Sequence, residues 1–567
     1  MTAEVMRLAI REMPPESIRT LIRATVSAIE ASFNTIDRLQ SRTRLSLALS
    51  LLETGAVKTG RFERPTAALA AGLAQLGVDD RHYWISTFFT LLMSVSLRRE
   101  KATYFTPPPV VRHLIDQAEK AGLDLKTARV IDPAAGGAAF VSSLAGRMTE
   151  LGCSVEDIRC RISGIEIDRH LALLGEALLC DRLGETYGDG GAGKLIRIGD
   201  SLTVEEAASY DAVFVNPPYG RIMGLPGAIP PEWLTFSAPG HINRYALFMD
   251  LAFRMAKPGG LVATVSPSSF ISGPLFGRLR EYIRARAEVV RIDVLERKDV
   301  FHDVQQDACV AIFQMRSGGM QNVSGFSPKF GRLDRNWSHM EAGAVAAANG
   351  ELSSPWVLPS QDGHDGGALE RCTARLSDYG VSPKAGYFVW NREQDRLQCG
   401  RKFGTAYPLF WAQNVKPGRP CMPSSKKGAG IDFVKFDAVH AGIIRRPSII
   451  LQRTTNSKQP RRLIAATIPR KVLKKHKGFV SENHTILLVP EGRANLSLLC
   501  KLLNTNAVDR RFRRIGGTQN VSIESLRNLP LPAQQHLRKA MMTTDDFEAA
   551  VESAYGMSAA AAESKAA

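Results

Sequence analysis

The spacing of apolar residues changes along the chain, and the change separates two kinds of structure. Through residues 1–100 apolar side chains recur at the spacing of one helix face. They include Ile18, Leu21, Ile22, Val26 and Ile29, followed by further leucines from Leu45 to Leu52. This region is therefore predicted to be helical, and it shows none of the carboxylate and lysine spacing that marks a nuclease site.

Beyond residue 100, short apolar runs alternate with helical patterns, which is typical of a doubly wound α/β fold with a mostly parallel sheet. Four consecutive runs stop at a polar side chain, namely Asp132, Glu166, Asp200 and Asn216. In a parallel sheet the carboxyl ends of neighbouring strands face one crevice. These four side chains are thus predicted to converge. Two later runs, 289–295 and 308–313, are predicted to form a closing antiparallel pair.

The first three of these strand ends have the character of a nucleotide site. Asp132 is followed by the small-residue turn 133–136, where a ligand can lie against the backbone. Glu166 offers a carboxylate that can accept both hydroxyls of a ribose. Asp168 competes for that role, although it equally fits the N-cap of the next helix. Asp200 can accept the exocyclic amine of an adenine.

The fourth strand ends in Asn216-Pro217-Pro218-Tyr219. The two prolines fix the backbone and bring no N–H donors, so the turn is stiff and its carbonyls can accept. The Asn216 side-chain oxygen and the Pro217 carbonyl suit the two N–H groups of a planar amine, and Tyr219 suits its ring face. Four residues alone are a weak motif. Upstream, Thr106 is predicted to cap a helix that begins with the following prolines.

Charge and cysteine content narrow the class of protein. The chain of 567 residues has a net charge of +17. Residues 401–540 hold 27 Lys and Arg against 6 Asp and Glu, while the rest of the chain is slightly acidic. Such a segment favours a polyanionic partner. The eight cysteines are scattered, so neither disulfides nor a metal site is predicted.

The chain is expected to be cytoplasmic rather than associated with a membrane. No apolar run approaches the ~18 residues of a membrane-spanning helix. Basic and acidic residues are interspersed among the first 14 residues, unlike in a signal peptide.

Taken in order, these motifs resemble the gamma-class N6-adenine DNA methyltransferases of restriction-modification systems, which use S-adenosylmethionine. The sequence carries Tyr-Phe-Thr-Pro-Pro, then Asp-Pro-Ala-Ala-Gly, Gly-Ile-Glu-Ile-Asp, Gly-Asp and Asn-Pro-Pro-Tyr, then a basic carboxyl-terminal region. The resemblance covers about residues 100–325. It departs from the family at Asp-Pro-Ala-Ala-Gly-Gly-Ala, where Asp-Pro-Ala-Cys-Gly-Ser-Gly is usual.

The resemblance implies a role for each motif residue. S-adenosylmethionine would contact Thr106 at its methionine end, Asp132, Pro133, Ala134, Ala135 and Gly136 beneath it, Glu166 at its ribose, and Asp200 and Pro218 at its base. The target adenine would lie against Asn216, Pro217, Pro218 and Tyr219. Phe301 is the candidate for a second stacking ring, with Phe270 and Phe313 as rivals.

The predicted domains are a helical region at 1–100, a methyltransferase domain at 101–325, a linker or insertion at 326–400, a mixed α+β DNA-recognition domain at 401–540 and a flexible tail at 541–567. A restriction or specificity subunit is an expected partner. Three alternatives stay open: a protein-glutamine methyltransferase, an RNA methyltransferase, and a DNA-binding subunit whose methyltransferase fold works only with a partner, assembled through the helical amino terminus.

Overall fold

The computed structural model describes most of the chain, and its contacts divide it into two compact units. The described residues are 16–33, 39–52, 63–94, 96–98, 105–187, 194–204, 208–222, 231–238, 241–295, 308–317, 326–334, 336–347, 352–359, 374–399, 405–425, 430–454, 461–515 and 521–566. Unit 1 comprises residues 1–268 and 278–343, and unit 2 comprises 269–277 and 344–567. Among the described residues, no helix is long and apolar enough to cross a membrane.

Unit 1 is built on a sheet with the strand order β3-β2-β1-β4-β5-β7-β6-β8-β9. The first five strands in this order, β3, β2, β1, β4 and β5, run parallel to one another. In contrast, β7 pairs antiparallel with both β5 and β6. The predicted closing pair is confirmed, with β7 inserted beside β5. The strands are β1 (Val130–Asp132), β2 (Ile162–Glu166), β3 (Ile196–Ile198), β4 (Tyr210–Val215), β5 (Ala256–Pro267), β6 (Ala287–Leu295), β7 (Ala308–Met315), β8 (Lys329–Leu333) and β9 (His339–Ala344).

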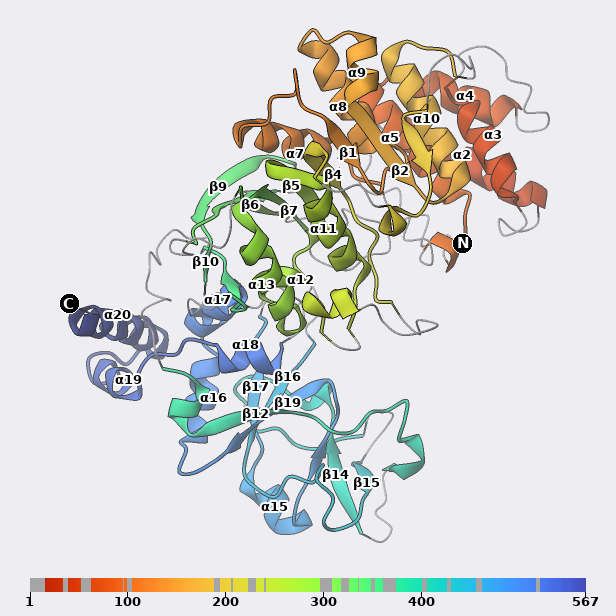
Figure 1. Ribbon diagram of the computed structural model, residues 1–567. Helices are drawn as coiled ribbons and strands as arrows, with labels where there is room; N and C mark the ends of the chain where they lie inside the picture. The colour runs from red at the N-terminus through yellow and green to blue at the C-terminus, as the bar shows by residue number, and fades with distance from the viewer. Residues whose placement is uncertain are drawn as a thin grey trace. The chain divides into compact units, whose positions relative to one another are not determined.

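Helices connect and cover these strands (Figure 1). They are α7 (Pro108–Lys120), α8 (Ala139–Glu150), α9 (Val155–Arg161), α10 (Arg169–Leu183), α11 (Arg244–Met255) and α13 (Gly277–Arg286). Their ends follow local capping chemistry: Asp168 accepts the first backbone N–H groups of α10, and Gly184 ends that helix at φ +71°. The predicted α/β fold class with a doubly wound sheet is confirmed.

The amino-terminal region is helical, as predicted. Its helices are α2 (Glu16–Phe33), α3 (Ser41–Leu49), α4 (Glu63–Leu73) and α5 (Val78–Leu91). They do not form a core of their own. Their apolar faces share one buried cluster with Leu171, Leu174 and Leu178 of α10, and Figure 1 shows them beside α8 and α10.

Unit 2 contains two four-stranded sheets of orders β12-β19-β16-β17 and β13-β15-β14-β18, and the pair β10-β11. The strands are β10 (Ala346–Ala347), β11 (Trp356–Val357), β12 (Val381–Ala385), β13 (Leu397–Cys399), β14 (Ala406–Phe410), β15 (Asp432–Lys435), β16 (Ile449–Gln452), β17 (Ala465–Thr467), β18 (Val480–Ser481) and β19 (Thr485–Pro490). The helices are α12 (Ser269–Ser272), α15 (Arg470–His476), α16 (Leu496–Leu503), α17 (Asn506–Ile515), α18 (Ile523–Arg527), α19 (Gln534–Ala540) and α20 (Phe547–Ala566). This unit is the mixed α+β part that the sequence predicted; the exact domain boundaries stay a prediction.

Candidate active site

The four polar strand ends of unit 1 lie on one cavity of about 670 Å³. Asp132 and Glu166 end β1 and β2, whereas Asp200 and Asn216 follow β3 and β4. All four line the cavity, and the four strands are neighbours in the sheet. Its volume is typical of a site for a cofactor or a small substrate. The parallel strand order thus brings together residues that are separated by up to 84 positions in the sequence.

Two carboxyl groups, buried Asp132 and half-buried Glu166, line this cavity. Asp132 is 2% exposed and accepts a hydrogen bond from the Ala134 N–H at 2.9 Å. Burial, together with the nearby charge of Glu166, raises the pKa of Asp132 to about 8. Burial likewise raises the pKa of Glu166, which accepts the backbone N–H groups of Gly136 at 2.9 Å and Asp168 at 2.8 Å. Asp132 is therefore largely protonated at neutral pH when no ligand is bound.

The pKa of Asp132 leads to a prediction about pH and stability. The folded protein holds this proton up to about pH 8, whereas an unfolded Asp releases it near pH 4. The contribution of protonated Asp132 to the free energy of unfolding is thus fully present below about pH 4. It is lost as the pH rises to 8. Asp132→Asn does not titrate and has no such loss. The melting temperature of this variant minus that of the wild type should therefore be roughly 5 °C larger at pH 8.5 than at pH 5. Calorimetry without ligand measures this, and an equal difference at both pH values would contradict it.

The turn after β1 is shaped for close backbone contact. Gly136 has φ +51°, and a Cβ on Gly137 would lie 2.4 Å from the Ser86 Oγ and 2.9 Å from the Phe105 ring. Ala138 stands where the resemblance expects glycine, yet it adopts φ +60°. That left-handed conformation costs an alanine roughly 1 kcal/mol. The turn therefore keeps the glycine geometry despite the different sequence.

The side chains of Asp168 and Asp200 each accept backbone N–H groups at the start of a helix. The Asp168 carboxylate accepts the N–H groups of His170 and Leu171, so Asp168 is the N-cap of α10. It also lines the cavity, and a role beside the ribose stays a prediction. Asp200 accepts the Leu202 N–H at 3.0 Å, is exposed and lines the cavity. Ile167, between Glu166 and Asp168 in the sequence, is 68% exposed and also lines the cavity. Sequence reasoning missed this apolar surface for a planar base, because an isoleucine at a strand end normally belongs to the core.

Asn216 is held by a residue from the segment before α7. Its Nδ2 donates a hydrogen bond to the Thr106 Oγ1 at 3.1 Å, and this sets which end of the amide faces Thr106. Thr106 is buried and lines the cavity. It does not cap the helix: the N-cap is Pro107 and has no side-chain hydrogen bond. The prediction of a Thr106 cap was wrong, since the hydroxyl is engaged by Asn216 instead.

The remaining predicted residues lie in different places. Pro218 lines the cavity. The Tyr219 hydroxyl donates to the Val265 carbonyl at 3.3 Å, and its ring packs against the central core. Phe301 lies outside the described residues. Its rivals Phe270 and Phe313 are fully buried, as core residues are. A stacking role for Tyr219 or Phe301 stays a prediction.

A second buried group in unit 1 combines residues far apart in the sequence. His113 and Asp293 are 2.7 Å apart, and His339 lies 3.6 Å from the other Asp293 oxygen. Histidine and carboxylate are metal-ligand types, but the Arg291 guanidinium also lies here, hydrogen-bonded to Asp293 and His339. Hydrogen bonds from His113 and Arg291 lower the pKa of Asp293 despite its burial. This network ties α7 to β6 and β9.

Comparisons with known proteins show what this part of unit 1 is similar to. Residues 191–301, which include the Asn-Pro-Pro-Tyr turn, match the model of the Eco57I restriction-modification methylase family. This segment is similar to a restriction-modification methylase. The match supports a DNA methyltransferase of the restriction-modification kind with S-adenosylmethionine as its cofactor.

Relatives extend the similarity beyond this segment. The chain is 24% identical over 374 residues to the Type II methyltransferase M.PstI of Providencia stuartii, covering 62% of this chain and 71% of that protein. It is 20% identical over 360 residues to the Type II methyltransferase M.BsuBI of Bacillus subtilis, covering 60% and 68%. Among solved structures, the Type IIL restriction-modification enzyme MmeI in complex with DNA aligns with a TM-score of 0.50 at 12% identity, over 99% of this chain and 91% of that one. At that identity the structural match shows the fold.

The cavity of the methylase domain fits S-adenosylmethionine. A ligand in the cavity would lie against the turn after β1, because residues 133–136 line the cavity. Glu166, which accepts backbone N–H groups, would offer its remaining lone pairs to ribose hydroxyls. Ile167 would offer an exposed apolar face to the base, and Asp200 would offer an acceptor.

Proposed function

We propose that the chain methylates N6 of adenine in double-stranded DNA in the cytoplasm, as the modification activity of a restriction-modification system. The observation that carries this proposal is the position of Asn216. Its amide stands at the end of β4, lines the same cavity as the three strand-end carboxylates, and is oriented by Thr106. An amide oxygen beside a stiff proline turn suits an amino group that must be held next to the cofactor.

The proposed chemistry uses hydrogen bonding rather than a strong base. An adenine amine is a poor nucleophile because its lone pair is delocalised into the ring. The Asn216 Oδ1 and the Pro217 carbonyl would accept its two N–H groups, localise the lone pair on nitrogen and stabilise the charge that develops there. When bound, S-adenosylmethionine supplies a methyl group on a positively charged sulfur. Thr106 acts as a positioning residue for the Asn216 amide.

The target adenine must leave the duplex to reach this cavity. Extruding a base costs a few kcal/mol, which stacking on protein rings and contacts to the DNA backbone offset. Tyr219 is the proposed stacking ring. Its hydroxyl bond to Val265 would hold the ring plane in place, so little side-chain entropy would be lost when the base binds.

DNA would be bound through basic residues of unit 2, but not mainly through the densest run in the sequence. Within 510–513, Arg510 and Arg511 pair with Glu552, and Arg513 pairs with Asp509. Arg511 is itself buried against Tyr555. Helix α15, in contrast, carries three exposed lysines, Lys471, Lys474 and Lys475. Their charges are available to phosphates.

These lysines give a prediction about salt dependence. Replacing Lys471, Lys474 and Lys475 by alanine should weaken DNA binding. It should also reduce the magnitude of the slope of log K against log salt concentration by about 0.9 for each phosphate that the protein no longer neutralises. Fluorescence anisotropy with a duplex at several salt concentrations measures both. As a control, Lys120→Ala with Lys126→Ala removes exposed charges from unit 1 and should leave the slope unchanged. An unchanged slope in the triple variant would remove α15 from the DNA-binding surface.

The proposed reaction is tested by its product. DNA from a methylation-free host that expresses this chain alone is digested to nucleosides and analysed by mass spectrometry. N6-methyladenine is expected, and long-read sequencing would place it within one recognition sequence. Methylated cytosine in its place would contradict the target base. Methylation of RNA or of protein glutamine would contradict the substrate. A product that forms only when a second subunit is added would show that the chain needs a partner.

A further inference from the structure

The amino-terminal helices contact the cofactor site at two points, one at its glycine turn and one at the wall of the cavity, although the sequence assigns them no chemistry. The first point is on α5. The Ser86 side chain lies against the glycine turn, with its Oγ 3.5 Å from the Gly137 carbonyl oxygen. A Cβ on Gly137 would be 2.8 Å from the Ser86 Cβ as well as 2.4 Å from its Oγ. The helix and the turn are therefore in direct contact, with no space for a larger residue on either side.

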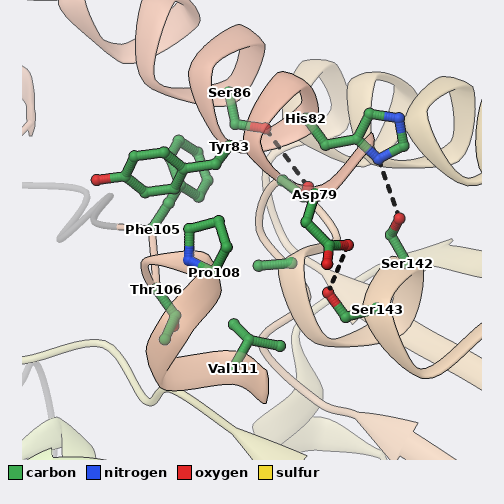
Figure 2. A pocket seen from close by; sticks show the side chains of 12 residues that line it. Asp79, His82, Tyr83, Ser86, Phe105, Thr106, Pro108, Val111, Ser142 and Ser143 are labelled. Carbon is green, nitrogen blue, oxygen red and sulfur yellow. Dashed lines mark hydrogen bonds between the residues drawn. The ribbon is translucent and has the colours of Figure 1, made fainter. Parts of the chain in front are cut away.

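The position of α5 is fixed by polar contacts to the helices that follow the two cofactor strands (Figure 2). On α8, Ser143 donates to Asp79 at 3.2 Å, and Ser142 lies 3.0 Å from the His82 Nδ1. On α10, Asp181 is 2.8 Å from the His82 Nε2 and also pairs with Arg81, while Arg182 pairs with Asp79. Burial lowers the pKa of His82, so a neutral imidazole bridges α8 and α10.

A small cavity remains between α5, the segment 105–108 and α8. Its volume is about 20 Å³, and Ser86, Phe105, Thr106 and Gly137 are among its lining residues. Figure 2 shows the side chains of Ser86, Phe105 and Thr106 around it. The space suffices for one water molecule and no more. A shift of α5 would therefore be transmitted to Thr106 and to the glycine turn, because little free volume lies between them.

The second point of contact is the start of α3. Ser41 is half-buried and lines the large cavity together with Asp168, Arg169 and His170 from the start of α10. Ser41 accepts a hydrogen bond from the Arg44 guanidinium at 3.1 Å. Arg44 is 7% exposed, and the charge of Asp168 opposes the lowering of its pKa by burial. The start of α3 is thus held beside the residues that follow the ribose-binding carboxylate.

We propose that the amino-terminal helices are an integral part of the cofactor site: Ser86 positions the glycine turn, and Ser41 forms one wall of the cavity beside the start of α10. Removing or displacing them weakens binding of S-adenosylmethionine itself. This inference rests on the assignment of the large cavity to that cofactor. It does not depend on which base is methylated.

The test is titration calorimetry of full-length variants with S-adenosylmethionine and no DNA. Ser86→Leu should raise the Kd at least about tenfold because the leucine displaces the turn, whereas Ser86→Ala should keep the Kd of the wild type within about twofold. Thr90→Val is the matched control on the same helix, since the Thr90 hydroxyl bonds only within α5, to the Thr87 carbonyl at 2.8 Å. Its Kd should not change.

Ser41→Trp tests the second contact independently, in case Ser86→Leu fails to fold. It places a bulky ring at the half-buried wall and should also raise the Kd about tenfold or more, while the exposed neighbour variant Arg42→Trp should not. Thermal unfolding without ligand identifies variants that are folded. Folded Ser86→Leu and Ser41→Trp proteins with the Kd of the wild type would overturn the inference. A wild type that does not bind S-adenosylmethionine would instead refute the cofactor assignment.

Discussion

Replacing Asn216 by alanine is expected to lower methyl transfer by about a hundredfold or more, while binding of S-adenosylmethionine and of DNA stays close to that of the wild type. The expected size is that of removing one preorganised hydrogen-bonding group from a developing charge. Binding of the cofactor should persist because Asp132 and Glu166, which also line the cavity, are unchanged. Single-turnover kinetics with a labelled methyl donor measure the chemical step, and calorimetry and anisotropy measure the two affinities.

Two further variants separate a role in the reaction from a role in folding. Asn216→Asp keeps an acceptor oxygen and should retain more activity than Asn216→Ala. Asn336→Ala removes an exposed asparagine of the same unit and should have no effect. If Asn216→Ala turned over at a rate within threefold of the wild type, the amide would not be an essential acceptor.

Glu166→Ala should have the second largest effect, a loss of cofactor affinity of about ten- to a hundredfold. Its carboxylate holds the N–H groups of Gly136 and Asp168 and is the proposed acceptor for the ribose. Hydrogen bonds to a charged group contribute about 1.5–3 kcal/mol each, so their loss should appear directly in the Kd. Titration calorimetry without DNA measures it.

The matched control for this variant is Glu156→Ala, an exposed acid on α9 of the same unit, which should bind the cofactor like the wild type. Glu166→Gln keeps two polar atoms but only one acceptor oxygen, so its Kd should lie between those of the wild type and Glu166→Ala. An unchanged Kd for Glu166→Ala would place the ribose elsewhere in the cavity.

Residues that terminate buried parallel strands could be predicted from the sequence because their positions follow from topology alone. Asp132, Glu166, Asp200 and Asn216 each end an apolar run, and adjacent parallel strands bring such ends to one edge. The fold class could be predicted from the same pattern. Periodicity also predicted the helical amino terminus, although not what that region contacts.

Contacts between distant segments could not be predicted, because they depend on how surfaces meet. The approach of Ser86 to Gly137 joins positions 51 residues apart, and the Asp293 network joins α7 to β6 and β9. In unit 2, Arg510 and Arg511 are a basic run in the sequence but are paired with Glu552 in the fold. Ile167 resembles a core residue until the cavity beside it is known.

The most direct test of the proposed chemistry is a structure of the full chain with duplex DNA and a non-reactive analogue of the cofactor. The expected result is an extrahelical adenine whose amino nitrogen lies about 3 Å from both the Asn216 Oδ1 and the Pro217 carbonyl oxygen. An adenine that remains stacked in the duplex, or a cytosine in that place, would contradict it.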